Sequence, residues 1–396
     1  MNCPCGRWEM GKSPVYKANL FFVAIFGWCL GSPPPGSAAV APVGQLPTVA
    51  VSVTPSVYAL PILLVENAGE WKDFGIQAKV KVHLHGEEQL DRSAANEWEV
   101  AVMDPLTAVK GGNEGNVAIV GIAGNFAGQI PFIQNQSATP PAQRKWNEWL
   151  KGFSTGEGWK GKKVFLPACL VATANYADTR KTLVIRWLEG YARGIRIIQK
   201  DPAMAAARLK EFYRETLRKD LPEPLLRQEV HAAFYFEDRD REEPFREKEG
   251  KPSPLEEFAR SMTAYLKGMK ALEGQAEPSE YLLPRICDQL SALRKEAVTQ
   301  LEKTAGAIEA AGQAGARVNH FQKTWEESKA QVEDGRGCLT AIGVLSDLQR
   351  SADQARVNNA RLRDFRRIET AVGGILALYY AGYYYHRRKR AKAHSS

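Results

Sequence analysis

The chain has few cysteines for its length, and their spacing argues against both a disulfide framework and a zinc site. Only six occur among 396 residues: three fall within the first 29 residues, and the others are far apart at Cys169, Cys287 and Cys338. An odd number of cysteines at wide spacing, once a cleaved leader is removed, argues against a disulfide framework. No cysteine or histidine pair has the spacing of a zinc site. We therefore expect no bound metal and no other cofactor.

Signatures of catalysis and of nucleic-acid binding are also missing. No His-Glu-x-x-His occurs. Residues 152–156 match a nucleophile elbow by letter and residues 156–162 match most of a phosphate loop, but neither has the strand–turn–helix context. The formal net charge of +8 comes from dispersed Lys and Arg, without an aromatic RNA-binding signature. The sequence predicts neither an enzyme nor a nucleic-acid-binding protein.

The N-terminus has the pattern of an export signal. Arg7, Lys12 and Lys17 precede the apolar run of residues 18–30, and small residues and prolines follow. We predict a signal peptide over residues 1–41, with cleavage favoured after Ala39. An uncleaved membrane anchor is the alternative, which the shortness of the apolar run disfavours. Export places the mature protein in the periplasm or another extracytoplasmic space.

The C-terminus carries a second uncharged stretch. Residues 370–385 are apolar and include five tyrosines, and a basic tail follows at residues 387–396. Tyrosines favour the membrane–water boundary, and basic residues favour the cytoplasmic side. The pattern predicts a transmembrane helix over residues 368–386 that anchors the protein in the cytoplasmic membrane. The alternatives are a terminal helix packed on the protein and a helix lying flat on the membrane.

Between these ends, predicted strands and helices alternate. This alternation predicts an α/β fold, with a parallel-dominated sheet and helices on both faces. The expected strands are residues 48–53, 78–84, 99–103, 116–122 and 169–174, and the expected helices include residues 58–67, 87–95 and 182–199.

The order of these segments resembles the nitrate/sulfonate/taurine type of substrate-binding protein of ABC transporters. The matching pieces are residues 54–61 (TPSVYALP), 71–76 (WKDFGI), 96–105, 159–167 (WKGKKVFLP) and 277–281. The resemblance implies a periplasmic-binding-protein-like domain over residues 46–283, in which two α/β lobes close on a ligand. The second lobe, at about residues 129–168, is reduced in this chain.

Candidate binding residues follow the carboxyl ends of the predicted parallel strands. These ends share one rim of a sheet, and the helix starts beside them offer N–H groups to anions. Two of the candidates also have a structural explanation, because Asp104 can cap the helix that starts at Pro105 and His85 can simply end a strand. The candidate substrate-binding residues are Thr54, Ser56, Tyr58, His85, Asp104, Thr107 and Asn125.

The resemblance implies the solute-binding component of an ABC-type importer. Its solute would be a small anionic or nitrogen- or sulfur-containing molecule, and its partners would be a permease and, through the C-terminal helix, the membrane. A membrane-anchored sensor or adaptor that uses the lobe without transport is the alternative. Thiamine-pyrimidine synthases share the fold family, but their cysteine-rich cluster is absent here.

Residues 284–367 have the pattern of a separate helical region. Leu290, Leu293, Ala297 and Leu301 recur at three- and four-residue steps, and glycine-containing breaks fall at residues 312–315 and 334–337. The heptad pattern is short and ragged, so we expect a small helical bundle in preference to a coiled coil.

Overall fold

The computed structural model describes residues 46–125, 166–236, 242–247, 250–272 and 276–393. The predicted signal peptide and all but the end of the predicted second lobe lie outside these residues. Within the described part, Leu46 onward belongs to one compact unit.

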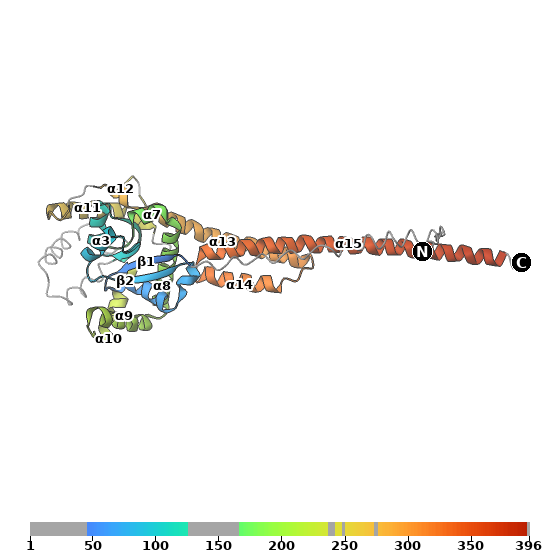
Figure 1. Ribbon diagram of the computed structural model, residues 1–396, viewed down its shortest axis with the longest axis horizontal. Helices are drawn as coiled ribbons and strands as arrows, with labels where there is room; N and C mark the ends of the chain where they lie inside the picture. Colours follow the sequence, from blue (N-terminus) through green and yellow to red (C-terminus); the bar gives the residue numbers. More distant parts are fainter. Residues whose placement is uncertain (1–45, 126–165, 237–241, 248–249, 273–275, 394–396) are drawn as a thin grey trace, which may run out of the picture. The chain divides into compact units, whose positions relative to one another are not determined.

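A mixed sheet forms the centre of the α/β body (Figure 1). Its order is β2–β1–β3–β5–β4–β6, and the strands β1 to β4 run in one direction while β5 and β6 run in the other. The predicted strands are therefore confirmed, and β5 joins the same sheet. The strands are β1 (Thr48–Val53), β2 (Gln77–Val82), β3 (Val100–Met103), β4 (Val117–Asn125), β5 (Pro167–Thr173) and β6 (Phe234–Tyr235).

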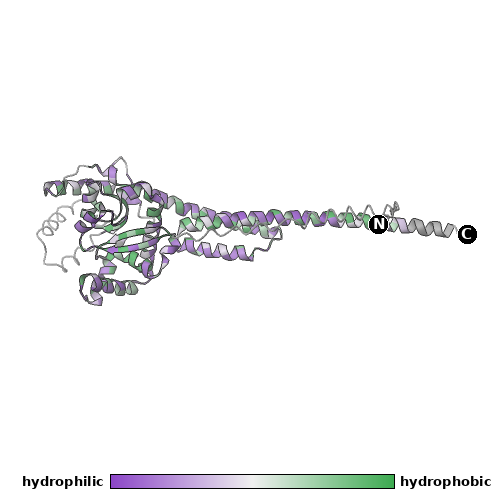
Figure 2. Cartoon of the chain, viewed as in Figure 1, coloured by the Kyte–Doolittle hydropathy of each residue, from purple (hydrophilic) through white to green (hydrophobic). Residues whose placement is uncertain are grey.

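Helices cover both faces of the sheet, as the alternating pattern predicted. Val51 and Val102 point into one core, beneath α2 (Leu60–Asn67), α8 (Lys181–Lys200) and α9 (Pro202–Leu217). Ala101 and Met103 point into the other, beneath α4 (Pro105–Asn113) and α11 (Pro254–Gly268). Figure 2 shows the apolar residues concentrated along the strands. The remaining helices of the body are η1 (Val57–Ala59), η2 (Glu70–Phe74), α3 (Gly86–Ala94), α7 (Ala174–Thr179), α10 (Glu223–Ala232), η6 (Glu243–Phe245) and α12 (Pro278–Tyr281).

Helix α8 is the main support of the first core. The face predicted from the sequence is buried, namely Val184, Trp187, Leu188, Tyr191 and Ile195. A Cβ atom placed on Gly194 of this helix would lie 2.1 Å from the carbonyl oxygen of Pro61 in α2. Helices α2 and α8 therefore cross at a point where only glycine fits.

Three long helices form the C-terminal region: α13 (Pro284–Gln313), α14 (Asn319–Glu333) and α15 (Cys338–Ala393). They pack through Ala311, Phe321 and Ala352, among others, and the predicted breaks separate them. The region is joined to the α/β body, because Ile286 of α13 lies in the first core and the Cys338 amide donates to Glu189 Oε1 at 2.8 Å.

The predicted transmembrane helix is not supported. Residues 368–386 are part of α15, and no helix in the described part of the chain combines the length and the apolar character needed to cross a bilayer. Tyrosines and glycines, such as Tyr379, Tyr383 and Gly382, lower the hydropathy of this stretch below that of a spanning segment. The membrane anchor inferred from it is therefore not supported either, and the basic residues 387–393 continue the same helix.

Candidate functional site

The carboxyl ends of β1 to β4 lie at one rim of the sheet, as predicted for parallel strands. Thr54 and Ser56 follow β1, His85 follows β2, and Asp104 follows β3. The last two loops touch, because a Cβ atom on Gly86 would lie 2.0 Å from Thr107 Oγ1 and 2.8 Å from Asp104 Oδ2. We call the described residues Thr54–Ser56, His85, Gly86, Asp104, Thr107 and Asn125 the rim.

Asp104 caps helix α4, which confirms the structural explanation of this residue. Its Oδ1 accepts hydrogen bonds from the amides of Leu106 and Thr107, both at 3.0 Å, and its Oδ2 accepts one from the Thr107 hydroxyl at 2.5 Å. Burial raises the pKa of the Asp104 carboxyl, although these bonds oppose the shift. Both the Asp104 and the Thr107 side chains are therefore occupied by hydrogen bonds that stabilise the start of α4.

Tyr58 and Asn125 also serve as structural ties. The Tyr58 hydroxyl donates to the Asn125 carbonyl at 2.7 Å, and Asn125 Oδ1 accepts from the Leu166 amide at 3.1 Å. Both side chains are buried. The second bond joins the end of β4 to the start of β5, where the chain leaves the sheet and returns to it.

Three of the predicted residues remain accessible to a ligand. Thr54 and Ser56 are partly exposed, and His85 is exposed. Ser56 precedes η1, and its side chain makes no capping hydrogen bond there. The rim thus offers two hydroxyls and an imidazole beside the partly buried carboxyl of Asp104.

Acidic side chains dominate the charge around the rim. Glu87 and Glu88 occupy the first turn of α3, where carboxylates already complement the partial positive charge of the helix start. Glu88 Oε2 accepts from the Leu84 amide at 3.0 Å, and Glu87 forms an ion pair with Lys110 at 2.7 Å. Asp104 is the carboxylate that directly adjoins the rim loop at Gly86, and it disfavours an anionic ligand and favours one that carries a protonated or donating nitrogen.

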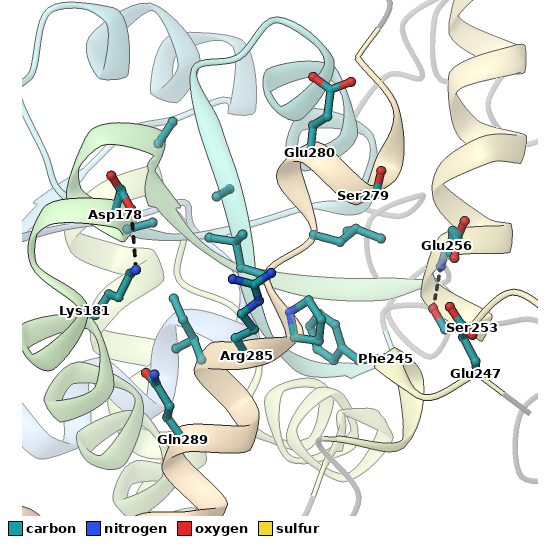
Figure 3. Close-up of a pocket in the computed structure, with 17 residues that line it drawn as sticks. Asp178, Lys181, Phe245, Glu247, Ser253, Glu256, Ser279, Glu280, Arg285 and Gln289 are labelled. Carbon is teal, nitrogen blue, oxygen red and sulfur yellow. Dashed lines mark hydrogen bonds and ion pairs between the residues drawn. The ribbon is translucent and has the colours of Figure 1, made fainter.

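A cavity of about 640 Å³ lies at the opposite edge of the sheet (Figure 3). It adjoins Ala118 near the amino end of β4 and Ala174 just after β5, and Lys181, Glu256 and Arg285 line its walls. Sequence reasoning missed this cavity. Its residues come from segments spread between Ala118 and Gln289, and no local motif joins them.

Two buried carboxylates lie away from both places. The Tyr213 hydroxyl donates to Glu229 Oε1 at 2.6 Å, and burial raises the pKa of Glu229 to about 7. Glu189 accepts from the Cys338 amide, and burial raises its pKa as well.

The described residues hold neither an activated thiol nor a cluster of metal ligands. Cys169, Cys287 and Cys338 are buried and form no disulfide with one another, and burial raises the pKa of the Cys169 thiol well above its usual value. In these parts of the chain, no group of three or more His, Cys, Asp or Glu side chains is placed to hold a metal ion.

Comparisons with known proteins give distant structural likenesses only. No family model and no curated protein matches the sequence. A Candida albicans protein described as having the generic periplasmic binding protein fold aligns at TM-score 0.41 and 9% identity, over 60% of this chain and 97% of its own. The periplasmic aliphatic sulphonate binding protein of Escherichia coli gives 0.41 and 7%, over 60% and 92%. The periplasmic nitrate-binding protein of Synechocystis PCC 6803 gives 0.39 and 10%, over 63% and 89%. Scores below 0.5 do not establish a common fold.

Proposed function

We propose that the α/β domain, residues 46–283, is an extracytoplasmic solute-binding module of an ABC-type importer, with a permease as its partner. The observation that carries this proposal is the convergence of four strand ends on one rim, which is where open parallel sheets bind ligands. The order of sequence segments that resembles nitrate/sulfonate/taurine-binding proteins supports the same function.

The charge of the rim narrows the class of solute. The partly buried Asp104 carboxyl lies beside Gly86, and Glu87 and Glu88 stand at the start of α3. An oxyanion placed beside Asp104 would be repelled by its carboxylate, whereas an N–H donor would be attracted. We therefore propose a small nitrogen-containing solute that donates hydrogen bonds, with Ser56 and His85 as its accessible contacts.

A sensor or adaptor without transport is the second candidate. It is favoured by the direct attachment of the helical region to the α/β body. Ile286 of α13 lies in the first core, and Arg196 of α8 donates to the Asp334 carbonyl, just before α15, at 2.5 Å. Ligand binding at the rim would then be transmitted to these helices.

A thermal-shift screen of the full chain tests the binding function. The panel pairs anions with donating nitrogen compounds of similar size, namely nitrate, bicarbonate and ethanesulfonate against taurine, ethanolamine and a pyrimidine. We expect a nitrogen compound to raise the melting temperature, because a ligand that binds only the native state stabilises it. Stabilisation by the simple anions alone would contradict the charge argument.

Ser56→Ala locates the site. Removing one hydrogen bond to the solute should weaken its affinity roughly two- to tenfold, corresponding to about 0.5–1.5 kcal/mol. Stability should change little, because the Ser56 side chain makes no capping bond. Ser351→Ala in α15 is the matched control, since that exposed hydroxyl donates only to the Asp347 carbonyl within its own helix. Equal affinities for all three proteins would exclude the rim.

A further inference from the structure

The cavity at the opposite edge of the sheet has an apolar floor. Ala118 of β4, Ala177 of α7, and Leu282 and Ile286 beside the start of α13 form part of its surface. All four side chains are buried. Such a floor favours the hydrocarbon portion of a ligand.

One wall of the cavity carries two basic side chains, and Asp178 and Glu280 also line the cavity. Lys181 begins α8 and Arg285 lies in the first turn of α13, and Figure 3 shows Arg285 near the middle of the cavity. Neither helix has a side-chain N-cap bond or an acidic residue in its first turn, so both starts retain their partial positive charge. Lys181 pairs with Asp178 at 3.5 Å, whereas Arg285 makes no ion pair among the residues that the structure describes.

The facing wall carries negative charge. Glu247 and Glu256 lie together across the cavity from Lys181 (Figure 3). Glu256 is already bound, since its Oε1 accepts from Arg260 at 2.8 Å. Glu247 is exposed and has no ion-pair partner among the residues that the structure describes.

We propose that this cavity binds a small zwitterion. Its oxyanion end would contact Arg285, its protonated amine would contact Glu247, and its hydrocarbon portion would lie on the apolar floor. A simple anion leaves Glu247 unsatisfied, and a simple cation leaves Arg285 unsatisfied. A molecule with both charges pairs each group, and charge-assisted hydrogen bonds are about twice as strong as neutral ones. This site is independent of the solute proposed for the rim.

Calorimetry on the full chain tests the proposal with a series of amino acids of increasing charge separation: glycine, β-alanine, γ-aminobutyrate and ε-aminocaproate. We expect one member to bind best, because the charge separation of the ligand must match that between Arg285 and Glu247. Single-charge analogues of the same length, a carboxylate without the amine and an amine without the carboxylate, should each bind at least about tenfold more weakly.

Two variants assign the two ends. Arg285→Gln and Glu247→Gln should each weaken binding of the best zwitterion at least about tenfold. Both side chains are exposed, so folding should be retained, which a melting curve checks. Arg350→Gln on the exposed part of α15 is the control for loss of an arginine. Ser56→Ala at the rim should leave this affinity unchanged, which separates the two sites.

Three results would overturn the proposal. The first is the absence of binding by every member of the series at millimolar concentration. The second is a single-charge analogue that binds as tightly as the zwitterion. The third is an affinity that Ser56→Ala lowers while Arg285→Gln does not, which would move the ligand to the rim.

Discussion

The buried carboxyl of Glu229 should make the protein less stable as the pH rises from 5 to 8. Burial raises its pKa from 4.5 in the unfolded chain to about 7 in the folded protein. The folded state therefore holds a proton that the unfolded state has lost. The contribution of Glu229 to stability is fully present below pH 4.5 and is lost as the pH rises through about 7, because ionisation of this carboxyl favours the unfolded chain.

The size of this effect follows from the shift. One pKa unit corresponds to about 1.4 kcal/mol, so Glu229 should lower the free energy of unfolding by less than about 1 kcal/mol at pH 5 and by about 3 kcal/mol at pH 8. Glu229→Gln removes the titration but keeps an oxygen that can accept from the Tyr213 hydroxyl. The difference in unfolding free energy between the variant and the wild type should therefore shift in favour of the variant by roughly 2–3 kcal/mol from pH 5 to pH 8.

Thermal unfolding at pH 5 and pH 8 measures this gain. For an α/β body of this size, roughly 2–4 °C per kcal/mol translates it into a relative shift of about 5–10 °C. Glu189 and Asp104 also have raised pKa values, but both titrate equally in the two proteins and cancel in the comparison. Glu223→Gln on the same helix is the control, since Glu223 is an exposed partner of Arg227. A Glu229→Gln difference that is the same at both pH values would refute the reasoning.

Two further predictions concern packing and the junction of the sheet. Gly194→Ala should lower the melting temperature by several degrees, because its Cβ would clash with the backbone of Pro61, whereas Gly343→Ala in α15 meets no atom within 4 Å and should be neutral or stabilise by up to about 1 kcal/mol. A stable Gly194→Ala protein would contradict the close crossing. Asn125→Ala should cost about 1–3 kcal/mol in chemical unfolding, because it leaves the buried Leu166 amide without its acceptor. Unchanged stability would mean that water replaces this bond.

The sequence predicts strands well where one pattern dominates. Val49, Val51 and Val53 mark a buried strand, and the lysines Lys79 and Lys81 of β2 mark a strand at the edge of the sheet. The direction of β5 could not be predicted. Its residues are buried on both faces, so its apolar run specifies neither a face nor a direction.

The candidate site was predicted only as a location. The Asp-Pro pair at residues 104–105 is a local signal, and the cap that it suggested is present. The roles of Tyr58 and Asn125 depend on contacts between positions 67 residues apart, which no local pattern encodes. The cavity was even less predictable from the sequence, because Lys181 and Arg285 line it together only through the packing of α8 and α13. The predicted membrane helix is not supported, because a run without charge is not the same as a run of high hydropathy.

The reactivity of the three buried thiols can report partial opening of the folded protein. Cys169 lies in the centre of the sheet, Cys287 holds α13 against β4, and Cys338 begins α15. Burial raises the pKa of Cys338 to about 12, so a thiol reagent reacts with it only when the start of α15 separates from Glu189. Labelling rates at the three positions would therefore distinguish release of the helices from loss of the sheet, without any substitution in the protein.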